Sequence, residues 1–197
     1  RILPLSQEQL DVKKAFTEWG YTGVCYDLEE PIEDCKLCDH HYIRYQFEIE
    51  NKYTTNKLLV GSRCIERFEI GGEEGMEKVQ ADLNKLLESA RSKRVLAAFD
   101  ALIPFCPDVA WTRIHYLEDA GLSPTALFLL LSLLEKHKVP LNPRDLTVRL
   151  RAHDSQQQLL EATDAQYQML LLCLSPAQKM KYPFKALVEH RNTKKQN

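Results

Sequence analysis

The first seventy residues alternate between apolar and polar positions in a way that predicts a small antiparallel sheet. Residues 42–50 place Ile43, Tyr45, Phe47 and Ile49 on one side, which is the two-residue period of a half-buried strand. Residues 22–28 have an extended pattern, and residues 57–60 form a returning strand after a polar turn at 51–56. A glycine-serine break at 61–62 ends that strand, and a short helix over 64–68 is expected next.

After residue 75 the apolar positions change to helical spacing. Residues 76–99 are predicted to form a long helix on the positions Met76, Val79, Leu83, Leu86, Leu87, Ala90, Val95 and Phe99. Asp108 is placed to cap a helix over 109–120. Ser123 followed by Pro124 predicts the start of a helix to about residue 138, whose nearly continuous leucine face should be the most buried of all.

Polar residues at the remaining helix starts complete the expected organisation. Ser6 with Gln9 has the spacing of a capping box before a short N-terminal helix. Ser155 is a further candidate cap, Thr163 another with Gln166 three residues on, and Ser175-Pro176 repeats the arrangement at 123–124. We therefore expect an α+β, mostly α fold: an N-terminal helix (1–21), a small zinc-stabilised β-hairpin module (22–70), and an α-helical domain with a basic C-terminal tail (71–197).

Composition places the chain among ordinary globular proteins. It has 197 residues, of which 44% are apolar and 27% charged, and a net charge of −2, so total charge does not point to an anionic partner. Basic residues gather late, because only Glu189 offsets the series Lys179, Lys181, Lys185, Arg191, Lys194 and Lys195. The longest apolar run is too short to span a bilayer and the first residues do not resemble a signal peptide. A cytoplasmic, reducing location without membrane contact is expected.

Three of the six cysteines have the spacing of metal ligands. Cys35 and Cys38 are separated by two residues, which lets both thiolates of a tight turn face one tetrahedral ion. A redox pair at this spacing normally opens a helix, whereas here a strand pattern follows. Cys64 comes after the hairpin at a glycine turn that begins a helix. This combination predicts a structural Zn²⁺ ion held by the three cysteines.

The fourth ligand is open at this level. A second pair of the same spacing would need Arg67 as ligand, and an arginine does not bind zinc. His40 is favoured because it falls on the same side of an extended chain as Cys38, and His41 and Cys25 are the alternatives. Cys106 and Cys173 are interpreted as small core residues.

The cysteine spacings and the strand pattern together resemble a known kind of module. Cys-x-Leu-Cys at 35–38, the alternating strand, and Leu-Val-Gly-Ser-x-Cys-Ile at 59–65 resemble zinc-ribbon or treble-clef-like modules of uncharacterised bacteriophage and mobile-element proteins. The resemblance implies bound zinc and a setting in the cytoplasm of a bacterium or of a phage host. It implies no particular activity.

Recognised catalytic signatures are missing from the chain. The glycines at 71–75 lack the Lys-Ser/Thr ending of a phosphate-binding loop. A Gly-x-Ser-x-Gly elbow, a His-Glu-x-x-His helix and the deaminase pair of His-x-Glu with Pro-Cys-x-x-Cys do not occur either. The sequence thus leaves catalysis open but favours a binding protein.

Two binding roles remain. The first is DNA or RNA binding, in which basic side chains contact phosphates and aromatic rings stack on bases. The residues expected to contribute are Lys36, Tyr42, Arg44, Tyr45, Arg63, Arg67, Arg149, Arg151, Lys179, Lys181 and Lys185. The second is a protein adaptor or inhibitor whose zinc module docks on a host or phage protein, for which the mixed charge of residues 22–70 is equally suitable.

Overall fold

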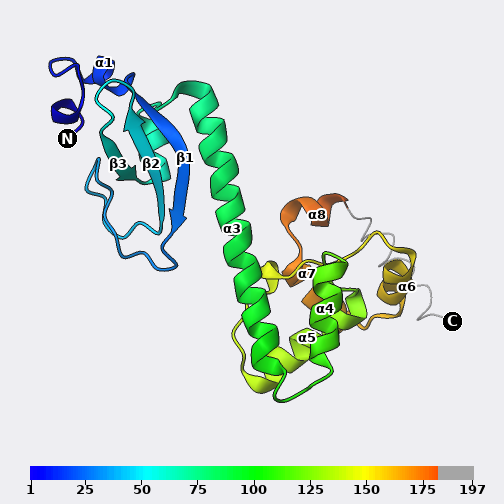
Figure 1. Cartoon of the computed structure of the whole chain (residues 1–197). Coiled ribbons are helices and arrows are strands. Elements are labelled where there is room, and N and C mark those ends of the chain that lie inside the picture. The colour runs from blue at the N-terminus through cyan, green and yellow to red at the C-terminus, as the bar shows by residue number, and fades with distance from the viewer. Residues whose placement is uncertain (182–197) are drawn as a thin grey trace. The chain divides into compact units, whose positions relative to one another are not determined.

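A computed structural model describes residues 1–181, which fall into two compact units (Figure 1). Unit 1 comprises Arg1–Ala90, and unit 2 begins at Arg91. Unit 1 carries a three-stranded sheet, and unit 2 is helical. This confirms the predicted α+β, mostly α fold.

The sheet of unit 1 is antiparallel with the strand order β1-β2-β3 (Figure 1). Its strands are β1 (Trp19–Asp27), β2 (Tyr45–Asn51) and β3 (Lys57–Val60). In the register, Phe47 of β2 lies between Cys25 of β1 and Val60 of β3. The predicted extended segment and hairpin are confirmed, although β2 begins at Tyr45 because Tyr42 has a left-handed backbone.

A bulge in β1 interrupts its pairing with β2. The register shifts between Tyr21 and Cys25, and Gly23 within this stretch has φ of 89°. This backbone conformation is one that glycine adopts without steric cost. A side chain there would also meet the Nζ atom of Lys78, which lies 2.9 Å from the position of a Cβ atom. The lysine chain end can move aside, so the positive φ is the constraint that favours glycine.

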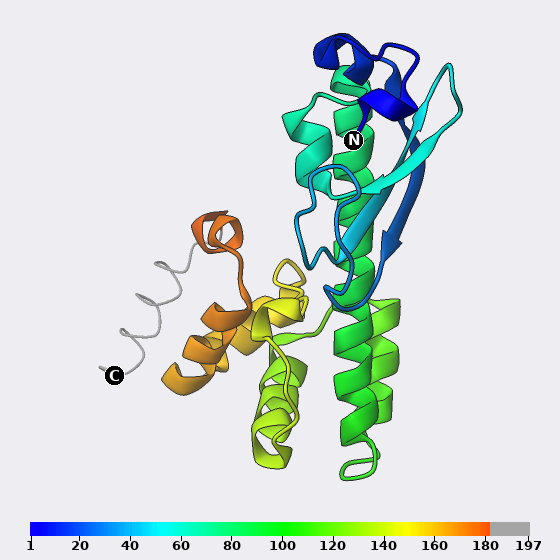
Figure 2. The same ribbon diagram turned by 90° about the vertical axis from the view of Figure 1, so that its left-hand side faces the viewer.

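The core of unit 1 lies between the sheet and the helices around it. Those are the 3₁₀ helix η1 (Leu3–Leu5), α1 (Val12–Phe16), α2 (Ser62–Arg67) and the first part of α3 (Gly72–Leu102), which lies alongside the sheet (Figures 1 and 2). Its buried apolar residues are Ile2, Ala15, Trp19, Cys35, Phe47, Ile49, Val60, Cys64, Ile65, Ile70 and Val79. Two cysteines of the predicted metal site are therefore part of this core.

The N-terminal segment differs from its prediction. Ser6 does not cap a helix: its hydroxyl donates to the Ile2 carbonyl (2.9 Å) and accepts from Trp19 Nε1 (2.8 Å). The cap of α1 is Asp11, whose carboxylate accepts from the Lys13 and Lys14 amides. The predicted capping box at Ser6 is wrong because the buried indole of Trp19, a long-range partner, takes the hydroxyl instead.

Glu18 ties the N-terminal segment to the hairpin turn. Its buried carboxylate accepts the backbone amides of Gln7 (2.8 Å) and Glu8 (2.9 Å) and the side-chain amide of Asn51 (2.8 Å). Burial alone would raise the pKa of Glu18. The hydrogen bonds from Asn51, Glu8 and Gln7 outweigh it and hold this pKa below the ordinary 4.5.

Because the folded-state pKa of Glu18 is depressed, its ionised form stabilises unit 1 at neutral pH, and this contribution is lost as pH falls through that pKa. We expect Glu18→Gln to lower the denaturation midpoint of the protein at neutral pH. The difference from the wild type should shrink at acidic pH. Chemical denaturation at both pH values, with the exposed Glu30→Gln as control, measures this effect. Equal differences at both pH values would contradict the role given to the carboxylate.

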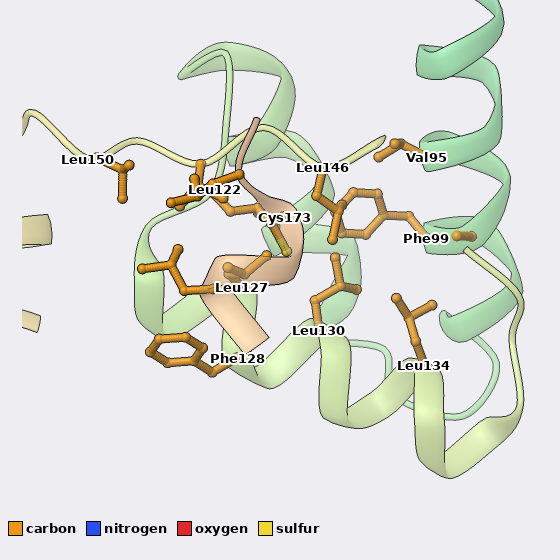
Figure 3. Packing of buried hydrophobic residues seen from close by; sticks show 14 of the residues in the cluster. Val95, Phe99, Leu122, Leu127, Phe128, Leu130, Leu134, Leu146, Leu150 and Cys173 are labelled. Carbon is orange, nitrogen blue, oxygen red and sulfur yellow. The ribbon is translucent and has the colours of Figure 1, made fainter. Parts of the chain in front are cut away.

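Unit 2 packs its helices around α5 (Pro124–His137). The other elements are the end of α3, α4 (Val109–Glu118), the 3₁₀ helix η2 (Pro143–Asp145), α6 (His153–Glu161), α7 (Asp164–Cys173) and α8 (Pro176–Lys181). Figure 3 shows Leu127, Leu130 and Leu134 of α5 together with Phe99, Leu122 and Leu146 in one apolar cluster. The predicted burial of the leucine face is confirmed.

The capping residues predicted for the helices of unit 2 are confirmed in part. Ser123 and Thr163 cap α5 and α7 through their side chains, and Ser175 accepts the Gln178 amide (3.2 Å) at α8, as predicted. Asp108 precedes α4 without a side-chain capping bond. Ser155 lies inside α6 and is buried, because the helix already starts at His153, so its predicted capping role is wrong.

Candidate metal centre

Three thiols converge at one end of the unit 1 sheet. Cys35 and Cys38 belong to the loop between β1 and β2, and Cys64 lies in α2 directly after β3. Cys64 Sγ is 3.1 Å from Cys38 Sγ and 3.5 Å from Cys35 Sγ, and the three sulfur atoms all lie within 4.8 Å of one another. Cys35 and Cys64 are buried, while Cys38 is exposed. The predicted trio is thus assembled as a group that could hold a metal ion.

Backbone hydrogen bonds fix the loop that carries the first two cysteines. The Asp39 amide donates to the Cys35 carbonyl (3.0 Å), and the Cys35 amide donates to the His40 carbonyl (2.9 Å), which closes a tight turn. The Lys36 amide donates to the Leu59 carbonyl (3.1 Å) and fastens this turn to β3. As β3 runs directly into α2, the same contact sets the distance from the turn to Cys64.

The thiols differ in how their surroundings treat the thiolate form. Burial opposes ionisation of Cys35, yet amides of Gly61, Cys38 and Leu37 donate to its sulfur and bring its pKa below the ordinary value. The pKa of Cys64 is raised, first by burial and then by its hydrogen bonds with Cys38 and Cys35. A bound dication would favour the thiolate at all three positions. Without an ion, the surroundings thus favour the thiolate form at Cys35 and oppose it at Cys64.

The separations suit zinc geometry better than a disulfide. Zn–S bonds of about 2.3 Å in a tetrahedral site place the sulfur atoms about 3.8 Å apart, and the observed 3.1 and 3.5 Å are somewhat shorter than this. A disulfide would need about 2.05 Å, and all six cysteines are free. Thiolate sets select zinc, copper(I) or iron–sulfur groups. The donor chemistry thus fits a soft metal ion and is compatible with the predicted zinc.

The fourth ligand stays a prediction. Among residues 1–181 the group of ligand atoms within 4.8 Å consists of the three thiols, but His40 lines the same pocket as they do. The Nδ1 atom of His41 lies 2.9 Å from an Asp34 carboxylate oxygen, and this contact lowers the pKa of Asp34. Cys25 lies on β1, where its thiol interacts with Tyr21. His40 is the candidate that shares the cysteines' surroundings.

A pocket of about 350 Å³ opens beside the thiols. Its lining includes the three cysteines, His40 and Ser62, and three arginines from two segments, namely Arg44, Arg63 and Arg67. Carboxylates are missing from this lining, which holds for the described part of the chain. The charged side chains that line the pocket are therefore arginines.

The three arginines are held to different degrees. Arg44 forms a bidentate pair with Asp27 (2.7 and 2.9 Å) and covers the Tyr45 ring at 5.1 Å. Arg67 covers the Phe68 ring at 5.3 Å. Arg63 is exposed and forms no hydrogen bond or ion pair with residues 1–181. The sequence reasoning missed Asp27, since nothing local signals a partner seventeen residues from Arg44.

The other predicted contact residues do not line the pocket. In the metal-site loop, Lys36 Nζ lies 3.6 Å from a Glu33 carboxylate oxygen, and Tyr42 is 75% exposed. Arg149 pairs with Asp119 (2.8 Å) in unit 2, where Arg151 and Lys179 are exposed. The side chain of Lys181 and all of Lys185 lie outside the described part of the structure. Of the predicted surface, Arg44, Tyr45, Arg63 and Arg67 line the pocket, while Lys36 and Tyr42 belong to the loop of Cys35 and Cys38 without lining it.

The predicted core cysteines of unit 2 contrast with the metal trio. Cys173 is buried, and burial raises its pKa to about 11. Cys106 is partly buried against the same apolar cluster. Both predictions are confirmed.

Comparison with protein-family models, with curated proteins and with solved structures gave no match to this chain. The phage and mobile-element resemblance therefore stays a prediction. None of the helices within residues 1–181 has the length and apolar character needed to cross a bilayer.

Proposed function

We propose that this chain is a non-catalytic zinc protein that binds nucleic acid through the face of unit 1 that carries the metal centre. The observation that carries the proposal is the pocket beside Cys35, Cys38 and Cys64, which is lined by three arginines and no carboxylate. Guanidinium groups bind phosphate oxygens in a planar, bidentate manner, and phosphate contacts supply most non-specific affinity for nucleic acids.

In this proposal the metal has a structural role. Cys35, Cys38 and Cys64 hold Zn²⁺ with His40 as fourth ligand, and the ion links the loop before β2 to the start of α2. That link places Arg63 and Arg67 on α2 beside Arg44, which immediately precedes β2. The resemblance to phage and mobile-element modules supports a role in the bacterial cytoplasm. There the protein would bind nucleic acid or a protein assembly that acts on nucleic acid.

Fluorescence anisotropy of the zinc-loaded protein with labelled single-stranded DNA, duplex DNA and RNA tests the proposal. We expect binding that weakens with salt, with the logarithm of the binding constant falling by about 0.7 per logarithmic unit of salt for each phosphate of an unpaired strand that is neutralised. The control is the same titration with an uncharged peptide nucleic acid of equal sequence, which should not bind. No binding to any of the three nucleic acids at low salt would contradict the proposed function.

A protein adaptor is the second candidate, because α4 exposes apolar side chains. Trp111 is 66% exposed, Leu117 53% and Ile114 40%, and their spacing of three residues puts them near one another on the helix. Tryptophan is enriched at the energetic centres of protein interfaces. A pull-down that is lost in Trp111→Ala, together with absent nucleic-acid binding, would favour this candidate.

A further inference from the structure

The pocket at the metal centre has features that discriminate between kinds of nucleic acid. It is a concave space of about 350 Å³, and the bases of a regular duplex are stacked inside the double helix and cannot enter such a space. An unpaired strand can turn a phosphate or a base into it, and single-strand binding proteins combine cationic grooves with aromatic platforms. The surroundings of the pocket contain both elements.

The cationic element is the pair of arginines on α2. Arg63 and Arg67 are four residues apart, so they lie on the same face of the helix, one turn from each other. Arg67 is placed over the Phe68 ring, whereas Arg63 has no partner in the described chain. The Arg67 guanidinium is thus held in place before a ligand binds, and the exposed Arg63 guanidinium is available to bind a phosphate from solvent.

The aromatic element is Tyr42, whose exposure is imposed by its backbone. Its φ is 61°, which costs energy for a residue with a side chain. The Ile43 amide donates to the Glu33 carbonyl (2.8 Å), and the Asp34 carboxylate accepts from the Tyr42 amide, so both sides of this residue are held. Ile43 itself lines the pocket. The strained turn therefore exposes the Tyr42 ring (75%) one residue before the pocket-lining Ile43.

We infer that this pocket binds one phosphate of an unpaired nucleic-acid strand through Arg63 and Arg67, while a neighbouring base stacks on Tyr42. The inference rests on the proposed function and narrows it to single strands. Arg44 lines the same pocket, but its charge is paired with Asp27, so the unpaired positive charge there comes from Arg63 and Arg67. Stacking tolerates any base, so recognition is by strandedness and charge, with little dependence on sequence.

The phosphate contact is tested with charge reversal in the full, zinc-loaded chain. Arg63→Glu is expected to weaken binding of a labelled oligothymidylate about tenfold or more, because it replaces a phosphate contact by a repulsion. Arg144→Glu, an equally exposed arginine in unit 2, is the matched control and should stay within about twofold. Zinc content and circular dichroism verify that both variants fold. Equal effects of the two substitutions would overturn the assignment of the pocket.

The stacking contact has its own matched pair. Tyr42→Ala is expected to weaken single-strand binding about tenfold, while Tyr42→Phe, which retains the ring, should bind like the wild type. Tyr53→Ala is the control, because Tyr53 is 59% exposed in the β2–β3 turn, at the end of the hairpin away from the metal-site loop. A loss in Tyr53→Ala as large as in Tyr42→Ala would overturn the stacking role.

Comparison of probes separates this inference from the proposed function. Oligothymidylate and the corresponding RNA are both expected to bind more tightly than a duplex of equal length, and their ratio shows which sugar the protein prefers. Duplex binding as tight as single-strand binding would overturn the inference and leave the proposed function intact. Absence of binding to all probes would overturn both. Competition by inorganic phosphate alone, at concentrations that ionic strength does not explain, would reassign the pocket to a free anion.

Discussion

Replacing Cys64 by serine is expected to abolish stoichiometric zinc binding and to unfold the β-rich part of unit 1. Cys64 is the residue through which α2 joins the site, since its sulfur is the close neighbour of both others. Structural zinc contributes about 10–16 kcal/mol to the folding of small zinc-finger peptides, as much as the whole stability of about 5–15 kcal/mol of a typical domain. Zinc content by mass spectrometry and hydrogen exchange of residues 22–70 measure the outcome.

Cys106→Ser is the matched control for this prediction, because Cys106 is a partly buried cysteine of unit 2. It should retain one zinc per chain. Full zinc binding by Cys64→Ser would refute the site, and loss of the helical structure of unit 2 in this variant would show that the two units do not fold separately.

The fourth ligand can be identified by replacing zinc with cobalt(II) as a spectroscopic probe in variants of the three candidate ligands. Tetrahedral cobalt absorbs in the visible region with a spectrum that depends on its ligands, and we expect His40→Ala to change that spectrum. His41→Ala and Cys25→Ser should leave it unchanged, since His41 is bound to Asp34 and Cys25 lies beside Tyr21. A change in Cys25→Ser alone would transfer the role to that cysteine.

Truncating Phe99 to alanine is expected to destabilise unit 2 by about 3–5 kcal/mol. The Phe99 side chain is fully buried in the apolar cluster (Figure 3). Its ring centre lies 5.6 Å from that of the Tyr116 ring. Its removal leaves a cavity that neighbouring helices fill only in part. Chemical denaturation followed by circular dichroism gives the change in unfolding free energy, and zinc content should be unaltered.

The control for the core substitution is Phe105→Ala. Phe105 is 62% exposed and stacks on His137 at 4.5 Å, so its loss should cost less than about 1 kcal/mol. Similar losses for the two phenylalanines would show that burial in this cluster does not dominate the stability of unit 2.

Short-range patterns were sufficient for the hairpin and for most helices. The alternation at Ile43, Tyr45, Phe47 and Ile49 predicts a strand because side chains of a strand point to opposite faces in turn. Ser123-Pro124 predicts the start of α5 because the cap acts within three residues. Even so, α3 begins at Gly72, before the predicted residue 76, and glycine is needed at Gly75 because a Cβ atom there would lie 2.9 Å from the Ile70 carbonyl oxygen.

Patterns failed where a distant group competes for the same side chain. Ser6 has the spacing of a cap, yet Trp19 and the Ile2 carbonyl take its hydroxyl in the folded chain. Ser155 is similarly drawn into the buried face of α6. Capping propensity is a local preference of modest size, and tertiary packing outweighs it.

The candidate site also combines features that local sequence patterns predict with features that only long-range contacts decide. The three candidate ligands were visible in the chain, because the two-residue spacing of Cys35 and Cys38 and the glycine turn before Cys64 are local features typical of metal-binding cysteines. The sequence did not show that Arg44, Arg63 and Arg67 lie together beside those thiols. It also did not show the contact with Asp27 that holds Arg44. These arrangements depend on how the loop before β2 and the start of α2 approach each other. That approach is set by long-range backbone bonds such as Lys36 to Leu59, which leave no periodic trace along the chain.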